Sequence, residues 1–93
     1  MQLGTVIGNV WATRKEDNLR GLKFLIVQPE LPDGTSTETP YIAIDRIGAG
    51  FGDKVMVTKG SAASKIEPNL SIPIDAIIIG IIDSVDVEGD NCG

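Results

Sequence analysis

The chain's most apolar stretch reads Ile77-Ile78-Ile79-Gly80-Ile81-Ile82. β-branched residues favour strands, and successive side chains of a strand point to opposite faces. This strand therefore carries isoleucine on both faces. Only one of its two sets, either Ile77, Ile79 and Ile81 or Ile78 and Ile82, can point into a small barrel.

The second isoleucine set needs a cover, and the sequence predicts no long helix to supply it. We expect Ile78 and Ile82 to face outward and to pack against a second copy of the chain. Burying two isoleucines at about 1.5–3 kcal/mol each favours association. The alternative is that residues 61–73 of the same chain fold over this face.

The remaining strands are marked by proline and glycine punctuation and by β-branched residues. Val55 and Val57 should point inward, Pro29 should end the second strand, and residues 61–65 have room for at most one short helical turn. This pattern predicts an all-β, closed or partly open barrel, with one domain over residues 1–87 and an acidic tail over 88–93. The five predicted strands lie at about 2–13, 22–28, 41–45, 54–59 and 77–87.

Composition narrows the class of partner. The 93 residues carry a net charge of −5, and the basic residues form no patch, so neither nucleic acid nor an anionic membrane is an expected partner. The longest apolar run is far shorter than a membrane-spanning helix, and the N-terminus lacks the pattern of a secretion signal. With a single cysteine, Cys92, no internal disulfide is possible, and a cytoplasmic location is expected.

Residues for catalysis or metal binding are scarce. There is no histidine and one cysteine, so the sequence predicts no enzyme, no metal and no cofactor. The isolated aspartates are interpreted as turn residues that bond nearby backbone N–H groups. The run Gly48-Ala49-Gly50-Phe51-Gly52 has the wrong spacing for a dinucleotide fingerprint and precedes a strand, so a turn is the simpler interpretation.

A nucleic-acid-binding barrel remains the alternative, because such barrels stack single-stranded bases on exposed aromatic residues. The chain has four aromatics, and Phe24 alternates with Leu22 and Ile26, which indicates a core position. Exposure of Trp11 or Tyr41 would favour this alternative, whereas the negative charge opposes it. A small enzyme that uses carboxylates ranks last.

The chain resembles the vertex proteins of bacterial microcompartments, the EutN/CcmL type. The resemblance covers residues 1 to about 87 in several blocks that occur in the same order. Among them are Val55-Met56-Val57-Thr58-Lys59-Gly60-Ser61-Ala62-Ala63 and the 73–83 block that contains the isoleucine stretch. The other blocks are 4–10, 12–15, 18–25 and 43–50.

This resemblance implies an OB-like five-stranded barrel that assembles into a homopentamer at the corners of a polyhedral shell of hexameric tiles. It places Gly48, Ala49 and Gly50 near the five-fold axis. It also implies that the subunit interface includes Ser61 and Ser64 besides the isoleucine strand. The candidate contacts to the hexameric tiles are Arg14, Lys15, Asn18 and Leu19.

One position departs from the family pattern. The family commonly has arginine where this chain has Ser64, and Lys65 follows. Lysine lacks the bidentate fork of arginine, so it is a weaker replacement in an intersubunit ion pair. The sequence leaves open whether the shell is a carbon-fixing or a catabolic one, and it assigns no role to Cys92 or the acidic tail.

Overall fold

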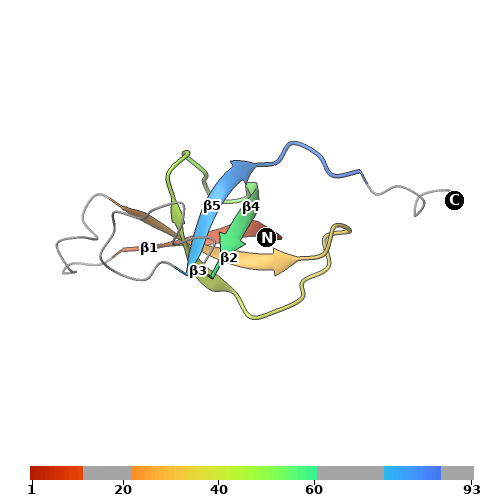
Figure 1. The fold of residues 1–93 in the computed structure, drawn as a ribbon, viewed down its shortest axis with the longest axis horizontal. Helices are drawn as coiled ribbons and strands as arrows, with labels where there is room; N and C mark the ends of the chain where they lie inside the picture. The colour runs from red at the N-terminus through yellow and green to blue at the C-terminus, as the bar shows by residue number, and fades with distance from the viewer. Residues whose placement is uncertain (12–21, 61–74, 87–93) are drawn as a thin grey trace, which may run out of the picture.

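The computed structural model describes residues 1–11, 22–60 and 75–86, which form a closed five-stranded barrel (Figure 1). The predicted all-β barrel is confirmed, and its third and fourth strands have the predicted bounds. The predicted helical turn at 61–65 and the tail at 88–93 lie outside the described residues. The strands are β1 (Gln2–Val10), β2 (Lys23–Glu30), β3 (Tyr41–Asp45), β4 (Lys54–Lys59) and β5 (Ala76–Ile81).

The strands follow one another around the barrel in the order β1-β2-β3-β5-β4, and β4 closes it by pairing with β1. The β3–β5 pair is parallel and the other pairs are antiparallel. Closure covers the strand edges over the paired residues, where they would otherwise pair with foreign chains. The β1–β4 pairing covers Gln2–Thr5 of β1.

Two β-bulges bend the strands. Val6 pairs with Val27 and Gly8 with Ile26, so Ile7 is an extra residue in β1. In the same way Val57 pairs with Ile78 and Met56 with Gly80, so Ile79 is an extra residue in β5. A bulge shifts the inside-outside alternation by one residue and increases the local twist. Strict alternation therefore fails beyond Ile7 and beyond Ile79.

Pro29 does not end β2, contrary to the prediction. The strand continues to Glu30, and Pro29 is buried opposite Gly4 of β1. The carbonyl of Pro29 accepts a hydrogen bond from the Thr37 amide. Because the N and C=O of one strand residue point to the same side, the missing N–H faces the 31–40 segment and costs the β1 ladder nothing.

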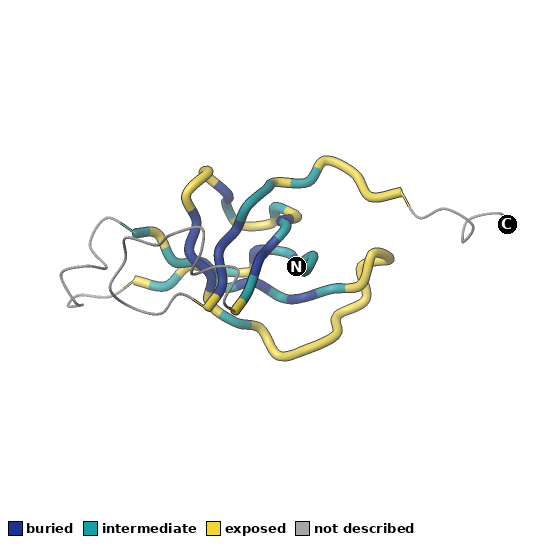
Figure 2. Tube along the Cα trace, in the orientation of Figure 1, coloured by how far each residue is buried: buried dark blue, intermediate teal, exposed yellow. Residues whose placement is uncertain are grey.

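The barrel interior is filled by alanine, valine, leucine and isoleucine side chains. Figure 2 shows where the buried residues lie along the chain. Val55 and Val57 point inward, as predicted, and are fully buried. Gly4 also lies inside, where β1 and β2 approach closely. The interior cluster consists of Val6, Leu25, Val27, Ala43, Ala49, Val55, Val57, Ala76 and Ile78.

The prediction that Ile78 faces outward is wrong. Ile78 is 1% exposed and belongs to the interior cluster, because Ala76 and Ile78 share the inner face of β5. Ile77 instead packs against Ile44 on the outside of the barrel, and both are buried within the single chain. The burial of Ile77 and Ile78 therefore does not by itself require a second copy, whereas Ile81 at the end of β5 is 43% exposed.

Phe24 is also placed differently from the prediction. Leu25 and Val27 occupy the inner face of β2, whereas Phe24 is half-buried against the outer pair of Ile44 and Ile77. Sequence alternation identified two faces of β2 correctly but assigned the core to the wrong one. The predicted continuation of β5 to about residue 87 is likewise wrong, since the strand ends at Ile81.

Candidate assembly surfaces

The glycine-rich loop between β3 and β4 forms a tight turn at the barrel surface. Gly48 and Gly52 have φ angles of 88° and 89°, which favour glycine over any other residue. Asp53 fixes the turn, because its carboxylate accepts a hydrogen bond from the Gly50 amide at 2.9 Å and its own amide donates to the Gly50 carbonyl at 3.0 Å. The interpretation of this run as a turn is confirmed.

The three loop residues predicted to lie near an axis have different surroundings. The Ala49 side chain is fully buried in the interior cluster, so only its backbone is available to a partner. A Cβ atom at Gly48 or Gly50 would have no neighbour within 4 Å among residues 1–11, 22–60 and 75–86. Gly50 has no left-handed φ either, so none of the described residues explains the absence of a side chain there.

A lysine–aspartate pair ties this loop to the barrel. The Lys23 ammonium donates to the Ala49 carbonyl at 2.7 Å and lies 3.5 Å from the Asp45 carboxylate. Asp45 accepts a hydrogen bond from the Ile47 amide through Oδ1, while its buried Oδ2 has no hydrogen-bond partner. The ion pair with Lys23 therefore supplies the main compensation for that buried oxygen.

Of the other predicted assembly residues, only Ile82 lies within the described part of the chain. Ile82 is half-buried beside β4, where its amide donates to the Lys54 carbonyl. The predicted interface residues Ser61 and Ser64, with the neighbouring Lys65, lie outside the described residues. The same holds for the predicted tile contacts Arg14, Lys15, Asn18 and Leu19.

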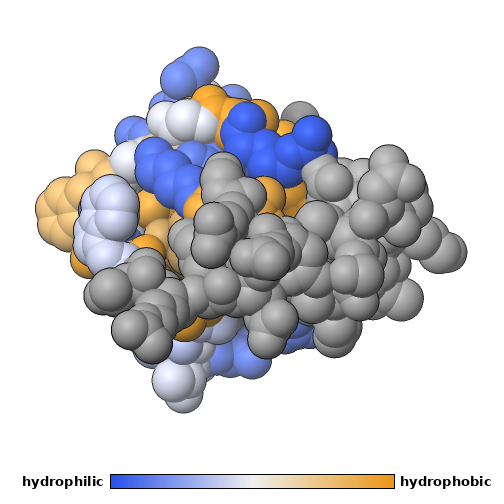
Figure 3. Space-filling view, turned by 90° about the vertical axis from the view of Figure 1, so that its left-hand side faces the viewer, coloured by the Kyte–Doolittle hydropathy of each residue, from blue (hydrophilic) through white to orange (hydrophobic). Residues whose placement is uncertain are grey.

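The sequence analysis missed the exposed isoleucines of β1 and β3. Ile7 and Ile42 are 43% and 53% exposed on the outer surface of the barrel. A signal was present, because Ile42-Ala43-Ile44 places apolar residues on both faces of a strand in the way that residues 77–82 do. Trp11 and Phe51 are exposed as well. Figure 3 shows hydrophobic surface next to hydrophilic surface on the face that it presents.

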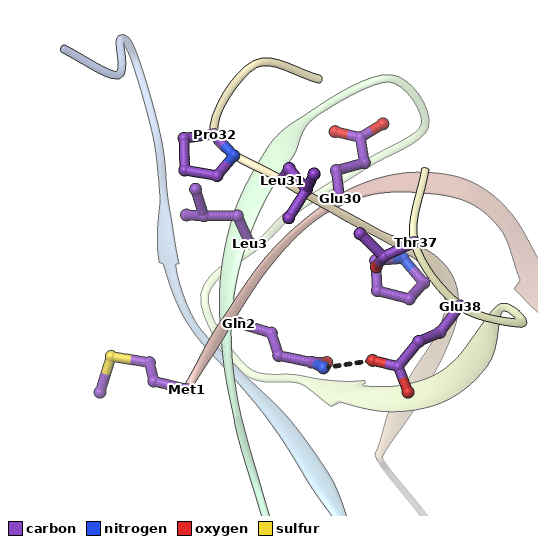
Figure 4. A pocket seen from close by; sticks show the side chains of 9 residues that line it. Met1, Gln2, Leu3, Glu30, Leu31, Pro32, Thr37 and Glu38 are labelled. Atoms are coloured by element: carbon purple, nitrogen blue, oxygen red, sulfur yellow. Dashed lines mark hydrogen bonds between the residues drawn. The ribbon is translucent and has the colours of Figure 1, made fainter. Parts of the chain in front are cut away.

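A shallow hollow of about 390 Å³ lies where the N-terminus meets the end of β2 (Figure 4). Gln2 crosses it and donates from its amide to Glu38 at 2.9 Å. The Gln2 carbonyl oxygen accepts a hydrogen bond from the Tyr41 hydroxyl at 2.8 Å. The hollow has mostly apolar walls and two carboxylates, those of Glu30 and Glu38.

The Tyr41 hydroxyl should lose its proton at a higher pH than an exposed tyrosine does. Burial, and to a lesser degree the charge of Glu38, raises the pKa of Tyr41 to about 12. Tyr41 is the only tyrosine in the chain, so absorbance at 295 nm as a function of pH reports this group alone. The phenol is held neutral in the folded protein, so its contribution to stability is complete below pH 10 and is lost as the pH rises towards 12.

Glu38→Gln serves as the control for this titration. It should lower the Tyr41 midpoint only slightly, because burial is the larger cause of the shift. A midpoint near pH 10 in the folded wild-type protein would contradict the burial of this hydroxyl.

Within the described residues no group of three or more His, Cys, Asp or Glu side chains is arranged to hold a metal ion. The same part of the chain contains no helix of the length and hydropathy needed to cross a membrane.

The family model described as ethanolamine utilisation protein EutN/carboxysome matches residues 1–83. This chain belongs to the EutN/CcmL family. A curated relative, the carboxysome shell vertex protein CcmL of Synechocystis, is 45% identical over 87 residues, which are 94% of this chain and 87% of the relative.

Solved structures agree with this assignment. The structure of CcmL from Gloeobacter violaceus is similar with a TM-score of 0.84 at 39% identity and covers 95% of this chain and 91% of that one. The GrpN pentameric microcompartment shell protein from Rhodospirillum rubrum is similar with a TM-score of 0.81 at 36% identity, over 94% and 99% of the two chains. The EutN/CcmL fold thus extends over nearly the whole chain.

Proposed function

We propose that this protein is a structural subunit of a bacterial microcompartment shell, forming pentamers that cap the shell's vertices. The observation that carries the proposal is the similarity to the pentameric GrpN shell protein over 99% of that chain. The family match over residues 1–83 and the vertex-protein relative from Synechocystis support it. The protein acts in the shell, within the bacterial cytoplasm, and has no catalytic role.

The function is geometric. Six-fold tiles alone make flat sheets, and a closed polyhedral shell needs five-fold corners. Identical barrels that meet head-to-tail, each rotated by one fifth of a turn, close into a ring with no free ends. The partners of such a ring are its own copies and the hexameric shell proteins that surround it.

The glycine loop is the proposed lining of the five-fold axis. Gly48 and Gly50 have open space where a side chain would stand, and Gly50 has no conformational reason to be glycine. Five copies of the loop meeting at an axis would supply that reason, because bulkier residues would crowd one another. Ala49 contributes backbone only, since its side chain fills the barrel.

The remaining assembly contacts are also proposals. Ile82, Ser61 and Ser64 belong to the subunit interface, and the Arg14–Leu19 loop faces the hexameric tiles. The proposed tile contacts are Arg14, Lys15, Asn18 and Leu19.

Native mass spectrometry at micromolar concentration tests the pentamer. We expect a species of about 49 kDa, five times the 9.8 kDa of one chain. A monomer under these conditions would refute the proposal.

The chain has one tryptophan, the exposed Trp11, so its fluorescence also tests the nucleic-acid alternative. We expect no change on adding a single-stranded oligonucleotide at low salt.

A further inference from the structure

Four apolar residues lie in line across the outer surface of the barrel, from the glycine loop over three strands. They are Phe51, Ile7, Ile26 and Ile42, and they are called the outer stripe below. None is charged, and Phe51, Ile7 and Ile42 are 78%, 43% and 53% exposed in the single chain.

Backbone pairing fixes the line. The Gly52 amide donates to the Val6 carbonyl at 2.8 Å, which places the Phe51–Gly52 turn beside β1 next to Ile7. Gly8 pairs with Ile26, and Ile26 pairs with Ile42. Directly paired residues of neighbouring strands lie within about 5.5 Å of each other on one face, so the stripe is continuous from β1 to β3.

The bulge at Ile7 and the glycine after it shape this surface. Val6 is buried in the barrel, and the extra residue puts Ile7 and Gly8 together on the outside. With no side chain at Gly8, Ile26 lies over the β1 backbone, 3.4 Å from where a Cβ would stand. Because Gly8 has no side chain, the surface at the stripe protrudes little, and another barrel can pack closely against it.

The neighbouring row of paired residues on β1, β2 and β3 differs from the outer stripe, because it is covered within the single chain. Val10 pairs with Phe24, and Phe24 pairs with Ile44, but these three side chains are already half-buried or buried within the chain. The outer stripe continues that apolar surface into solvent. An uncharged, apolar row with an aromatic residue at one end has the composition of an interface centre.

We infer that the outer stripe is one side of the contact between neighbouring subunits of the ring, occupied by a second copy of this chain. The inference rests on the proposed pentamer. Each copy carries a net charge of −5, so copies repel one another in general and approach best where a surface carries no charge. Phe51 also adjoins Gly50, so one contact would run from the axis outward along the barrel.

Ile42→Glu tests the stripe, with Leu31→Glu as the matched control. Leu31 is comparably exposed, at 49%, but lies in the 31–40 segment away from the stripe. We expect Ile42→Glu to raise the concentration at which pentamers dissociate by at least about a hundredfold, because each contact would bury an unpaired charge. Sedimentation velocity measures this, and circular dichroism shows that both variants remain folded. Leu31→Glu should sediment like the wild type.

A second measurement leaves the ring intact. Phe51→Cys and Leu31→Cys, each in a Cys92→Ser background, are labelled with a maleimide as native pentamers. We expect the thiol at position 51 to react at least about tenfold more slowly, although Phe51 is the more exposed residue in the single chain.

Pentamers that persist in Ile42→Glu, or equal labelling at positions 51 and 31, would overturn the outer stripe while leaving the pentamer in place. A wild-type protein that sediments as a monomer would overturn the proposed function itself.

Discussion

Replacing Gly4 with alanine should lower the free energy of unfolding by about 2–3 kcal/mol. A Cβ at this position would stand 2.5 Å from Cγ1 of Val27 and 2.8 Å from the backbone oxygen of Gln28. Val27 is fully buried in the barrel, and the backbone of β2 is held in its ladder, so neither can move aside at low cost. For a domain of this size the loss corresponds to a fall in Tm of roughly 8–24 °C.

Gly8→Ala is the matched control, since it makes the same chemical change on the same strand. Its Cβ would meet Ile26 at 3.4 Å, and Ile26 is a half-buried side chain at the outer surface that can rotate. We expect a Tm within a few degrees of the wild type. Thermal unfolding followed by circular dichroism, at one protein concentration for all variants, separates the two cases. Equal melting temperatures for Gly4→Ala and the wild type would contradict the close approach of β1 and β2.

The strands could be predicted from the sequence because their signals are local. Proline and glycine separate the runs of β-branched residues, and Val55 and Val57 alternate regularly with Lys54, Met56 and Thr58, so β4 was correct in bounds and in the facing of its two valines. No bulge interrupts β4 between Lys54 and Met56 in its pairing with β1. Where the ladder is regular, a period of two is sufficient.

The facing of β1 could not be followed past Ile7, because a bulge shifts every later side chain by one position. Both bulged residues, Ile7 and Ile79, stand directly before a glycine. Glycine within a strand often marks such a site, so the Ile-Gly pairs were an available signal. Ile78 precedes the bulge at Ile79, so its wrong placement has another cause. Both faces of β5 are apolar, and the sequence does not say which of them points into the barrel.

The assembly surfaces were harder to predict than the fold. Exposure of Ile42 depends on what covers β3, which is a tertiary property that neither composition nor periodicity contains. The link between Lys23 and Asp45 joins residues far apart in sequence through the register of β2 and β3. Only the glycine loop was identified directly, because left-handed turns demand glycine at fixed positions.

Removing the Lys23 charge should have the other large effect. Asp45 has a side chain that is 1% exposed, with an Oδ2 atom that no hydrogen bond satisfies, so the ammonium at 3.5 Å is its main electrostatic partner. Breaking a buried pair costs several kcal/mol, and because the Lys23 side chain is itself 51% exposed we expect a smaller loss of about 2 kcal/mol in Lys23→Met. Urea unfolding measures it.

A double-mutant cycle assigns that loss to the pair. Asp45→Asn keeps an oxygen that can accept from the Ile47 amide and removes the charge that Lys23 compensates. If the ion pair is the cause, Lys23→Met should cost about 1 kcal/mol less in the Asp45→Asn background than in the wild type. Strict additivity would contradict this and leave the hydrogen bond from Lys23 to the Ala49 carbonyl as the cause. In either case Lys23→Met removes the contact that holds the loop carrying Gly48 and Gly50, so faster amide hydrogen exchange should be confined to residues 46–53. Lys23, a half-exposed residue of β2, would then control the conformation of the loop proposed to line the five-fold axis.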